Sequence, residues 1–241
     1  MLVAYEYAAY QLGIPLGVHW TPSPTNPVHT LVLGPSGTGK TVFSASLAAR
    51  VALHVPDAKI WIASYKDDDF LSFCKDVEGA RYGCFNDGSM AIIREFRSVL
   101  DARLGGNQDR SFRLLWVDEV ATMQKCLPKA DSIFVRDTIS AALQTGRSLN
   151  CQVLVSLLRG DSEFFNNGAR ESFGNIWFLG TNISKEAAAM FGVDRATLPP
   201  VKGRAGYYIV NGNSEAIRPI QCPIIRDATK LKAALLAGIT Q

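Results

Sequence analysis

The sequence has no long apolar run and no signal peptide. No stretch of 18 consecutive apolar residues occurs in the 241 residues, so an ordinary transmembrane helix is excluded within them. The N-terminus lacks the charged and apolar regions of a secretory signal. We therefore expect a soluble, cytoplasmic chain. A membrane-anchored partner and a missing N-terminal anchor both stay open.

Cysteine pairs with metal-site spacing are also missing. The five cysteines never show the Cys-x-x-Cys spacing of a zinc site, and an odd number favours reduced thiols, which are typical of the cytosol. They are Cys74, Cys84, Cys126, Cys151 and Cys222. No internal repeat or low-complexity stretch is present. The length therefore predicts a single domain with a substantial core.

Charge of either sign is not in large excess. The chain has 25 Lys and Arg against 22 Asp and Glu, which gives a net charge of +3. This small excess permits a polyanionic partner without requiring one, because a local basic patch matters more than the total. The 47% of hydrophobic residues is ordinary for an α/β protein.

The most specific motif follows the apolar run 29–33. It consists of Gly34, Pro35, Ser36, Gly37, Thr38, Gly39, Lys40 and Thr41. This is the GxxxxGKT pattern of a P-loop, and a strand before it with a helix after it is the context that the motif needs. Backbone N–H groups of the glycine-rich turn and the N-terminus of the following helix attract phosphate. We predict that the loop binds ATP, with Lys40 on the β- and γ-phosphates and the Thr41 hydroxyl on Mg²⁺.

An acidic pair ends the apolar run 112–117. Asp118 and Glu119 fit the Walker B pattern, in which the aspartate holds Mg²⁺ and the glutamate polarises the attacking water. A glutamate at this position is typical of the additional-strand class of P-loop ATPases and disfavours a small-molecule kinase. In that class a further strand lies between the P-loop strand and the Walker B strand. The strand predicted at 151–157 is the candidate. The sequence lacks the LSGGQ signature of ABC-type ATPases.

Apolar periodicity and turn residues predict alternating helices and strands. We expect helices over 1–12, from the P-loop to about residue 54, and over 88–104, 132–147, 186–191 and 227–237. We expect strands over 16–20, 29–33, 59–64, 112–117, 151–157, 175–179, 207–210 and 216–220. This order predicts an α/β, RecA-like fold: a mostly parallel central sheet flanked by helices, with an antiparallel hairpin at the edge.

Within one ATPase domain spanning 1–241 we expect three parts. Residues 1–28 form a lead-in, residues 29–225 the ATPase core, and residues 226–241 a C-terminal helix. The turn Asn211-Gly212-Asn213 would join the two strands of the hairpin.

Arg147 stands just before the strand predicted at 151–157. An arginine there can lie at a subunit edge and reach the γ-phosphate of a neighbouring subunit, because a guanidinium is always charged and forks onto phosphate oxygens. A surface arginine in a helix-to-strand turn is the alternative. The first interpretation makes Arg147 a catalytic residue supplied from a neighbour.

Taken in order, these segments resemble the FtsK/HerA superfamily of DNA-pumping ATPases. Besides the P-loop, the resemblance is carried by Gly13–Gly17, Ser64–Asp67, Leu114–Val120, Gly146–Ser156 and Gly203–Tyr208. It covers most of the chain and supports the assignment of Arg147 as an arginine finger. Only the P-loop is specific by itself. The ordered set makes the resemblance informative.

The chain departs from the family pattern at Leu158. The family has a glutamine there, at the end of the sensor strand, and leucine cannot hydrogen-bond to a γ-phosphate. Three explanations stay open. A polar group such as Ser156, Gln144 or Asn150 substitutes, hydrolysis is slow, or the correspondence is shifted by one residue.

The resemblance implies a homo-oligomer, a hexameric ring, that threads double-stranded DNA and contacts its backbone. The candidate DNA contacts are Lys125 and Lys129 after Walker B and Arg159 and Arg170 after the sensor strand. Solvated surface charges are the alternative for Lys125 and Lys129. Two acidic residues weaken the basic character of the second loop.

The prediction is an oligomeric, Mg²⁺-dependent ATPase that translocates DNA. Conjugative transfer, chromosome segregation and genome packaging all fit, and conjugation is favoured because a motor core alone suits a compact genetic module. One rival is a protein-secretion or filament-assembly ATPase of the same fold, which the weakly basic loops allow. The other is a nucleotide-binding scaffold with little turnover, which Leu158 suggests.

Overall fold

One sheet organises the chain. The computed structural model describes residues 1–22, 28–158, 172–190, 192–210 and 217–241. Within these ranges ten strands form one sheet in the order β2-β1-β10-β9-β8-β3-β7-β6-β4-β5. The strands are β1 (Leu2–Glu6), β2 (Gly17–His19), β3 (Thr30–Leu33), β4 (Lys59–Ser64), β5 (Tyr82–Cys84), β6 (Arg113–Asp118), β7 (Cys151–Leu157), β8 (Asn175–Leu179), β9 (Ala205–Val210) and β10 (Arg218–Gln221).

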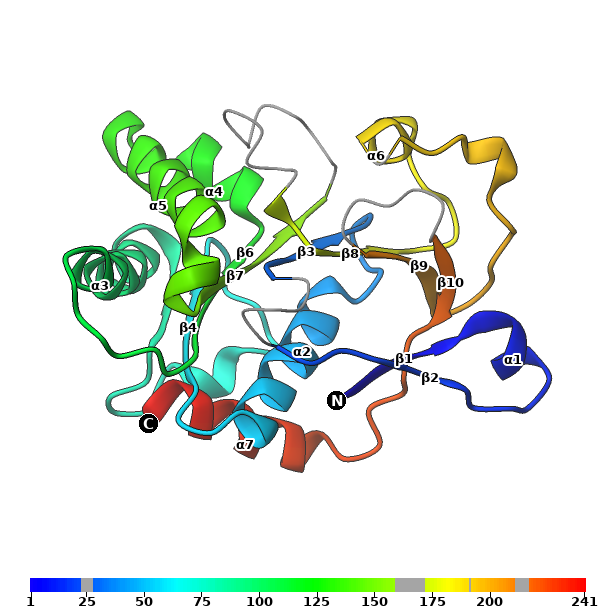
Figure 1. Cartoon of the computed structure of the whole chain (residues 1–241), viewed down its shortest axis with the longest axis horizontal. Coiled ribbons are helices and arrows are strands. Elements are labelled where there is room, and N and C mark those ends of the chain that lie inside the picture. Colours follow the sequence, from blue (N-terminus) through cyan, green and yellow to red (C-terminus); the bar gives the residue numbers. More distant parts are fainter. Residues whose placement is uncertain (23–27, 159–171, 191, 211–216) are drawn as a thin grey trace.

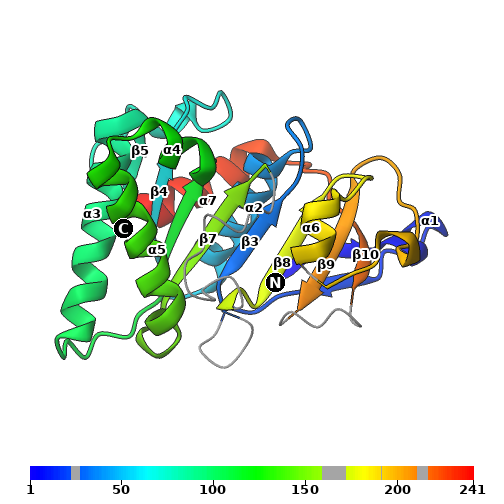
Figure 2. The ribbon, with the colours of Figure 1, turned by 90° about the horizontal axis from the view of Figure 1, so that it is seen from above.

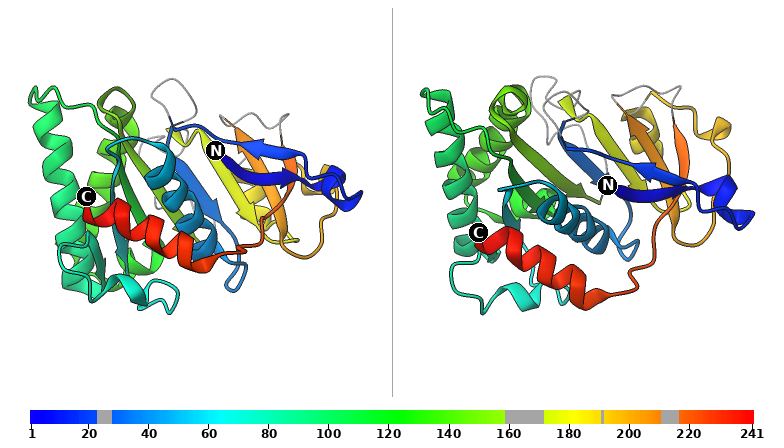
Figure 3. Two further views of the ribbon diagram at one scale, coloured as in Figure 1. Left: turned by 90° about the horizontal axis from the view of Figure 1, so that it is seen from below. Right: turned by 60° about the horizontal axis from the view of Figure 1, so that its bottom comes forward.

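Helices cover both faces of the sheet. They are α1 (Tyr7–Gln11), α2 (Lys40–His54), α3 (Phe85–Leu104), α4 (Val120–Cys126), α5 (Lys129–Leu149), α6 (Lys185–Met190) and α7 (Ala228–Thr240), with 3₁₀ turns at Ser72–Cys74 and Arg195–Thr197. Helices α3, α4 and α5 lie on one face, and α2 and α7 lie on the other (Figures 1 and 3). None of the helices described is both long and apolar enough to cross a membrane.

Six neighbouring strands, from β8 to β5, are mutually parallel. Every residue of β3, β6 and β7 is buried, as expected for strands covered by helices on both faces. Trp61 and Phe96 meet edge to face at 5.7 Å in the core under α3 and α5, whereas Trp116 and Leu47 belong to the core under α2 and α7. The parallel half therefore has two separate apolar cores that hold its strands in register.

The other four strands, β9, β10, β1 and β2, are antiparallel to their neighbours. Trp177 of β8 stacks on Tyr208 of β9 with 3.8 Å between ring centroids, and the Tyr208 hydroxyl donates to Asn175 Oδ1 at 2.8 Å. Phe43 of α2 packs on Trp177 at 5.2 Å. These aromatic contacts join the antiparallel half to the P-loop helix, and Figure 2 shows the two halves continuing one sheet.

The order of the central strands confirms the additional-strand prediction. Strand β7 lies between β3 and β6 and pairs with both in parallel. The predicted pair of strands 207–210 and 216–220 is also present as antiparallel β9 and β10, although residues 211–216 lie outside the described residues. The mostly parallel, helix-flanked fold is therefore as predicted.

The helix expected over 1–12 is wrong for residues 2–6. These residues form β1, which pairs with β10 on one side and β2 on the other, and only 7–11 are helical. Pairing with a strand more than 200 residues away outweighs the local helical pattern. As a result β9 and β10 are not the edge of the sheet, because β1 and β2 extend the antiparallel region beyond them. Strand β5 and helix α4 were not expected. The division into 1–28, 29–225 and 226–241 stays a prediction.

Candidate functional site

The parallel register brings the predicted site residues to one edge of the sheet. The P-loop follows β3, Asp118 ends β6 with Glu119 directly after it, and Ser156 is next to last in β7. Strand β4 pairs with β6 in parallel, and Ser64 at the end of β4 lies beside Asp118. Because these strands are parallel, their carboxyl ends meet at the same edge, where α/β proteins place their ligands.

The P-loop has the backbone shape that phosphate binding requires. Gly37 and Gly39 have φ values of +79° and +86°, which favour glycine. A Cβ on Gly34 would lie 2.2 Å from the Leu179 carbonyl oxygen, so only glycine lets β3 leave the sheet here. Gly39 is the N-cap of the 15-residue helix α2, whose first turn contains no acidic residue. The positive end of this helix therefore faces the loop, and no residue of its own first turn offsets that charge.

Lys40 is buried, with 5% of its surface exposed, and its Nζ donates to the Pro35 carbonyl oxygen at 3.1 Å. Burial lowers its pKa, and the nearby carboxylates of Glu119 and Asp118 act in the opposite direction. The Nζ lies 3.8 Å from Glu119 Oε1. The ammonium group is thus held inside the curve of the loop, where a phosphate would be its counter-ion.

Asp118 is fully buried, and hydroxyl groups bond to both of its carboxylate oxygens. The Thr41 hydroxyl donates to Oδ2 at 3.1 Å, and the Ser156 hydroxyl donates to Oδ1. Burial raises the pKa of Asp118, and the hydroxyl of Ser156 opposes this shift. The charge of Lys66 also opposes it, and a bound cation would further stabilise the charged form of this buried carboxylate.

These groups fit a magnesium ion. Mg²⁺ prefers hard oxygen ligands and is commonly bound by one or two protein oxygens together with phosphate and water. The Thr41 hydroxyl and the Asp118 carboxylate supply two such oxygens within 3.1 Å of each other. The predicted metal ligands therefore lie together, directly beside the phosphate loop.

Glu119 occupies a constrained position immediately after β6. Its φ and ψ of 53° and 42° are left-handed, and it is the N-cap of α4. The residue is 7% exposed, and its Oε2 is buried without a hydrogen-bond partner within the described part of the chain. Its Oε1 lies 3.5 Å from Lys66 Nζ as well as near Lys40. A strained backbone and an unsatisfied carboxylate oxygen are features of catalytic positions.

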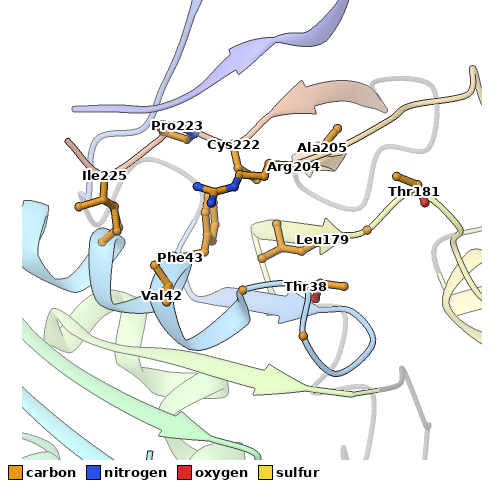
Figure 4. Close-up of a pocket in the computed structure, with 15 residues that line it drawn as sticks. Thr38, Val42, Phe43, Leu179, Thr181, Arg204, Ala205, Cys222, Pro223 and Ile225 are labelled. Carbon is orange, nitrogen blue, oxygen red and sulfur yellow. The ribbon is translucent and has the colours of Figure 1, made fainter. Parts of the chain in front are cut away.

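A cavity of about 440 Å³ opens beside the P-loop, on the side away from Glu119. Its walls come from the P-loop and α2, from the end of β8, and from the segments around β9 and β10 (Figure 4). The lining includes Thr38, Phe43, Leu179, Arg204, Cys222 and Ile225. The size and the mostly apolar lining suit a nucleoside. A nucleotide whose phosphates occupy the loop would extend into this cavity.

Of the three polar groups considered for the missing sensor glutamine, only Ser156 reaches the site. It is buried, and its hydroxyl bonds to Asp118. Asn150 lies at the other end of β7, where its amide donates to the Arg110 carbonyl oxygen at 2.8 Å, and Gln144 is exposed on α5. Leu158 itself is 37% exposed. Asn150 is thus ruled out as a substitute by position, because it lies a whole strand away.

Arg147 lies in the last turn of α5, at the amino end of β7. It is exposed and, at ~3.3 Å per residue, about 20 Å along β7 from the edge that carries the P-loop. A Cβ on Gly146 would lie 2.0 Å from the Cys151 carbonyl oxygen, so glycine permits α5 to pack closely on the start of β7. Arg147 is therefore too distant for the nucleotide site of its own chain, and any role in catalysis requires a neighbouring subunit.

The candidate DNA contacts are only partly described. Lys125 lies in the last turn of α4, Lys129 is the first residue of α5, and both are exposed. Arg159 and Arg170 lie outside the described residues. The five cysteines are all free thiols.

Two functional features were not identified from the sequence. Lys66 was part of the Ser64–Asp67 segment, but its contact with Glu119 was not foreseen. The sequence did contain one hint of this contact. Lys66 follows Ser64 by two residues, and Ser64 pairs with Asp118 in the register of β4 on β6. The nucleoside cavity draws on segments near 40, 180, 204 and 223, and no local pattern joins them.

No family model matches the chain, and no curated protein matches it. Its structure does match solved structures. The cytoplasmic domain of the Thermomonospora curvata type VII secretion ATPase EccC has a TM-score of 0.67 and 14% identity, over 100% of this chain and 31% of that one. The pCW3 conjugation coupling protein TcpA, in its monomer form with ATPγS, has a TM-score of 0.65 and 14% identity. This match covers 87% of this chain and 64% of that one.

A viral protein of similar length also matches. The genome packaging NTPase B204 from Sulfolobus turreted icosahedral virus 2, in complex with ATPγS, has a TM-score of 0.51 and 13% identity, over 82% of this chain and 98% of that one. The chain spans about a third of EccC and less than two thirds of TcpA. These likenesses show the fold. The chain shares the RecA-like P-loop fold of these ATPases.

Proposed function

We propose that this chain binds ATP, hydrolyses it at an interface between copies of itself, and uses the reaction to move double-stranded DNA. The observation that carries the proposal is the convergence of three groups at one edge of the sheet. Thr41 and Asp118 are hydrogen-bonded, and Glu119 lies in the same site, with its Oε1 3.8 Å from Lys40 Nζ and its Oε2 without a hydrogen-bond partner among the described residues. The site thereby combines a phosphate-binding loop with Lys40, the cation ligands Thr41 and Asp118, and Glu119 as a base.

The triphosphate would lie in the P-loop, with the nucleoside in the adjoining cavity. Backbone N–H groups of residues 34–41 and the N-terminus of α2 would bind its phosphates, and Lys40 Nζ would turn from the Pro35 carbonyl oxygen to the β- and γ-oxygens. Thr41 and Asp118 would hold Mg²⁺, which when bound would neutralise charge on those oxygens. Binding thus uses loop backbone and two side-chain oxygens.

Glu119 would act as the general base. A water oxygen forms a bond to the γ-phosphorus while the bond from that phosphorus to the bridging oxygen of ADP breaks, and the proton of the water moves to Glu119 Oε2. The products are ADP and inorganic phosphate. Lys40 and the loop N–H groups stabilise the charge that develops on the transferred phosphoryl oxygens.

Arg147 of a neighbouring copy would complete the site. Its place at the amino end of β7, far from its own P-loop, favours a role in trans. A guanidinium brought to the γ-phosphate from another subunit makes hydrolysis depend on assembly. We infer a closed ring, a hexamer, in the cytoplasm, and the setting that we favour is conjugative transfer.

Double-stranded DNA is the favoured substrate because two of the structures that the chain resembles are named as a conjugation coupling protein and a genome packaging NTPase. Exposed Lys125 and Lys129 at the junction of α4 and α5 supply positive charge beside the nucleotide edge. Together with Arg159 and Arg170 they are the proposed phosphate contacts.

Phosphate release tests the proposal. We expect the wild type to release phosphate from ATP faster when linear duplex DNA is present, and Lys40→Ala to release none under either condition. The mass of the protein with ATPγS should correspond to an oligomer. Wild-type protein that binds ATP without releasing phosphate, even when oligomeric and with DNA, would instead support a scaffold with little turnover.

A protein-moving motor is the second candidate. The match to a type VII secretion ATPase covers the whole chain, and the net charge is only +3. Such a motor would hydrolyse ATP through the same residues but would not respond to duplex DNA. The two candidates therefore share the ATP site and differ in the polymer that stimulates hydrolysis, which is duplex DNA for one and protein for the other.

A further inference from the structure

Lys66 joins the predicted catalytic glutamate to the strand beside it. Ser64 ends β4 next to Asp118, and the Ser64 hydroxyl donates to the Lys66 carbonyl oxygen at 2.9 Å. This turn directs the lysine side chain to the next strand end, where its Nζ lies 3.5 Å from Glu119 Oε1. The contact therefore follows from parallel pairing and a short polar turn.

Two lysines approach the same oxygen of Glu119. Lys40 Nζ lies 3.8 Å from Oε1 and Lys66 Nζ lies 3.5 Å from it, whereas Oε2 is buried and unpartnered among the described residues. Lys40 is also the residue that a P-loop directs to phosphate. Once Lys40 contacts the nucleotide, Lys66 is the cation that continues to hold Oε1.

We propose that Lys66 is a positioning residue, which fixes Glu119 through Oε1 so that Oε2 faces the attacking water. The inference rests on the proposed hydrolysis of ATP. It assigns the two carboxylate oxygens different roles: one is anchored by Lys66, and the other accepts the proton. A general base acts only when its accepting atom is within hydrogen-bond reach of the water.

The surroundings of Lys66 suit an anchor. Asp68 Oδ2 lies 3.6 Å from its Nζ on the other side, so the ammonium group is held between two carboxylates. Burial by itself would lower the pKa of Lys66, but Glu119, Asp118 and Asp68 together raise it above its ordinary value. The side chain is therefore charged at neutral pH and carries a permanent positive charge beside the base.

Lys75 provides a matched control. It lies in the same segment after β4, and its Nζ pairs with Asp67 rather than with a site residue. Its substitution by methionine removes the same charge from the same region and leaves Glu119 untouched. We expect Lys75→Met to hydrolyse ATP within about twofold of the wild type.

Lys66→Met should lower kcat by about 10- to 100-fold, because small misplacements of a catalytic group have effects of this size. The KM for ATP and the Kd values for ATPγS and ADP, measured by fluorescence titration, should stay within about twofold of the wild type. Lys66→Arg should recover most of the rate, since it keeps the charge. An unchanged kcat in Lys66→Met would overturn the proposal. A loss of ATPγS affinity with ADP affinity retained would also overturn it, because Lys66 would then bind the γ-phosphate.

A second readout does not depend on turnover. Urea unfolding of Lys66→Met, Glu119→Gln and the double variant, without added nucleotide, measures whether the two side chains interact. We expect the midpoint shift of the double variant to differ from the sum of the single shifts, and additive shifts would overturn the pairing. No phosphate release by the wild type, combined with non-additive shifts, would contradict the proposed function while keeping the ion pair.

Discussion

The two sides of the P-loop are built differently. The phosphate side, at the ends of β4, β6 and β7, consists of buried polar and charged side chains such as Lys40, Asp118 and Ser156. The nucleoside side, where β8 meets the antiparallel strands, is formed mostly by apolar side chains and glycines, with Arg204 as its charged residue. The difference teaches that the register of parallel strands places the proposed catalytic groups, whereas the packing of the antiparallel half against α2 shapes the cavity proposed for the nucleoside.

The largest expected effect lies on the phosphate side. Lys40→Ala should abolish both ATP binding and turnover, because it removes the buried cation of the loop. Glu119→Gln should keep ATP binding and lower kcat by about 10³-fold, since an amide cannot take the proton. Nucleotide titration and phosphate release measure the two effects separately. Glu95→Gln, an exposed change on α3, is the control. Turnover that survives in Glu119→Gln would remove its assignment as the base.

Arg147 tests whether the phosphate side is completed from outside the chain. Arg147→Ala alone should lower turnover by about 10²-fold, the size expected when one group that stabilises the transition-state charge is lost. Asp118→Asn subunits should also be inactive, but a mixture of the two variants should regain part of the activity, because some interfaces then combine an intact Asp118 with an intact Arg147. Full activity of Arg147→Ala would contradict a role in trans.

On the nucleoside side, the effect should be on binding and not on chemistry. Val42 lines the cavity from α2, and Val42→Trp would fill part of the 440 Å³. We expect KM for ATP to rise about tenfold with kcat nearly unchanged, since groups that bind substrate and transition state equally affect KM alone. Leu53→Trp, an exposed position on the same helix outside this cavity, is the control. A fall in kcat with constant KM would show that the two sides are not separable.

The smallest effect concerns His29, at the opposite end of β3. Burial lowers its pKa from 6.5 to about 3, and its Nδ1 accepts a hydrogen bond from the Val153 N–H at 3.1 Å. Below pH 6.5 the unfolded chain binds a proton that the folded chain does not, so stability that is present above pH 6.5 is lost as the pH falls toward 3. The loss is about 1.4 kcal/mol per pH unit from this group.

Urea unfolding between pH 7 and pH 4 measures that loss. His29→Gln should reduce the pH dependence, and His54→Gln, at an exposed position, should leave it unchanged. The same slope in His29→Gln as in the wild type would show that other groups account for the acid sensitivity. Because His29 is far from the nucleotide edge, neither variant should change kcat or KM for ATP.

The phosphate side could be predicted from the sequence because its signals are local. The P-loop and the pair Asp118-Glu119 are short motifs attached to apolar strands, and the position of β7 followed from the presence of Glu119. The contact of Lys66 with Glu119 was missed because it requires the register of β4 on β6, which residue patterns alone do not give.

The nucleoside side could not be predicted because its parts are distant in the sequence. Cys222 and Arg204 meet Phe43 only after β1 has paired with β10 and β9 with β8. Residues 2–6 carry a pattern that also suits a helix, and only their partner strands decide between the two. Local patterns therefore identified which residues lie together beside the P-loop, and long-range pairing determined the shape of the cavity on its other side.

The rate of ATP hydrolysis with and without linear duplex DNA, measured over a range of salt concentrations on the ATP-bound oligomer, tests the central claim most directly. We predict that duplex DNA raises the rate several-fold at low salt and that the stimulation falls as salt increases, because Lys and Arg contacts to phosphate are screened and compete with counterions. A rate that is the same with and without duplex DNA at every salt concentration would contradict DNA translocation.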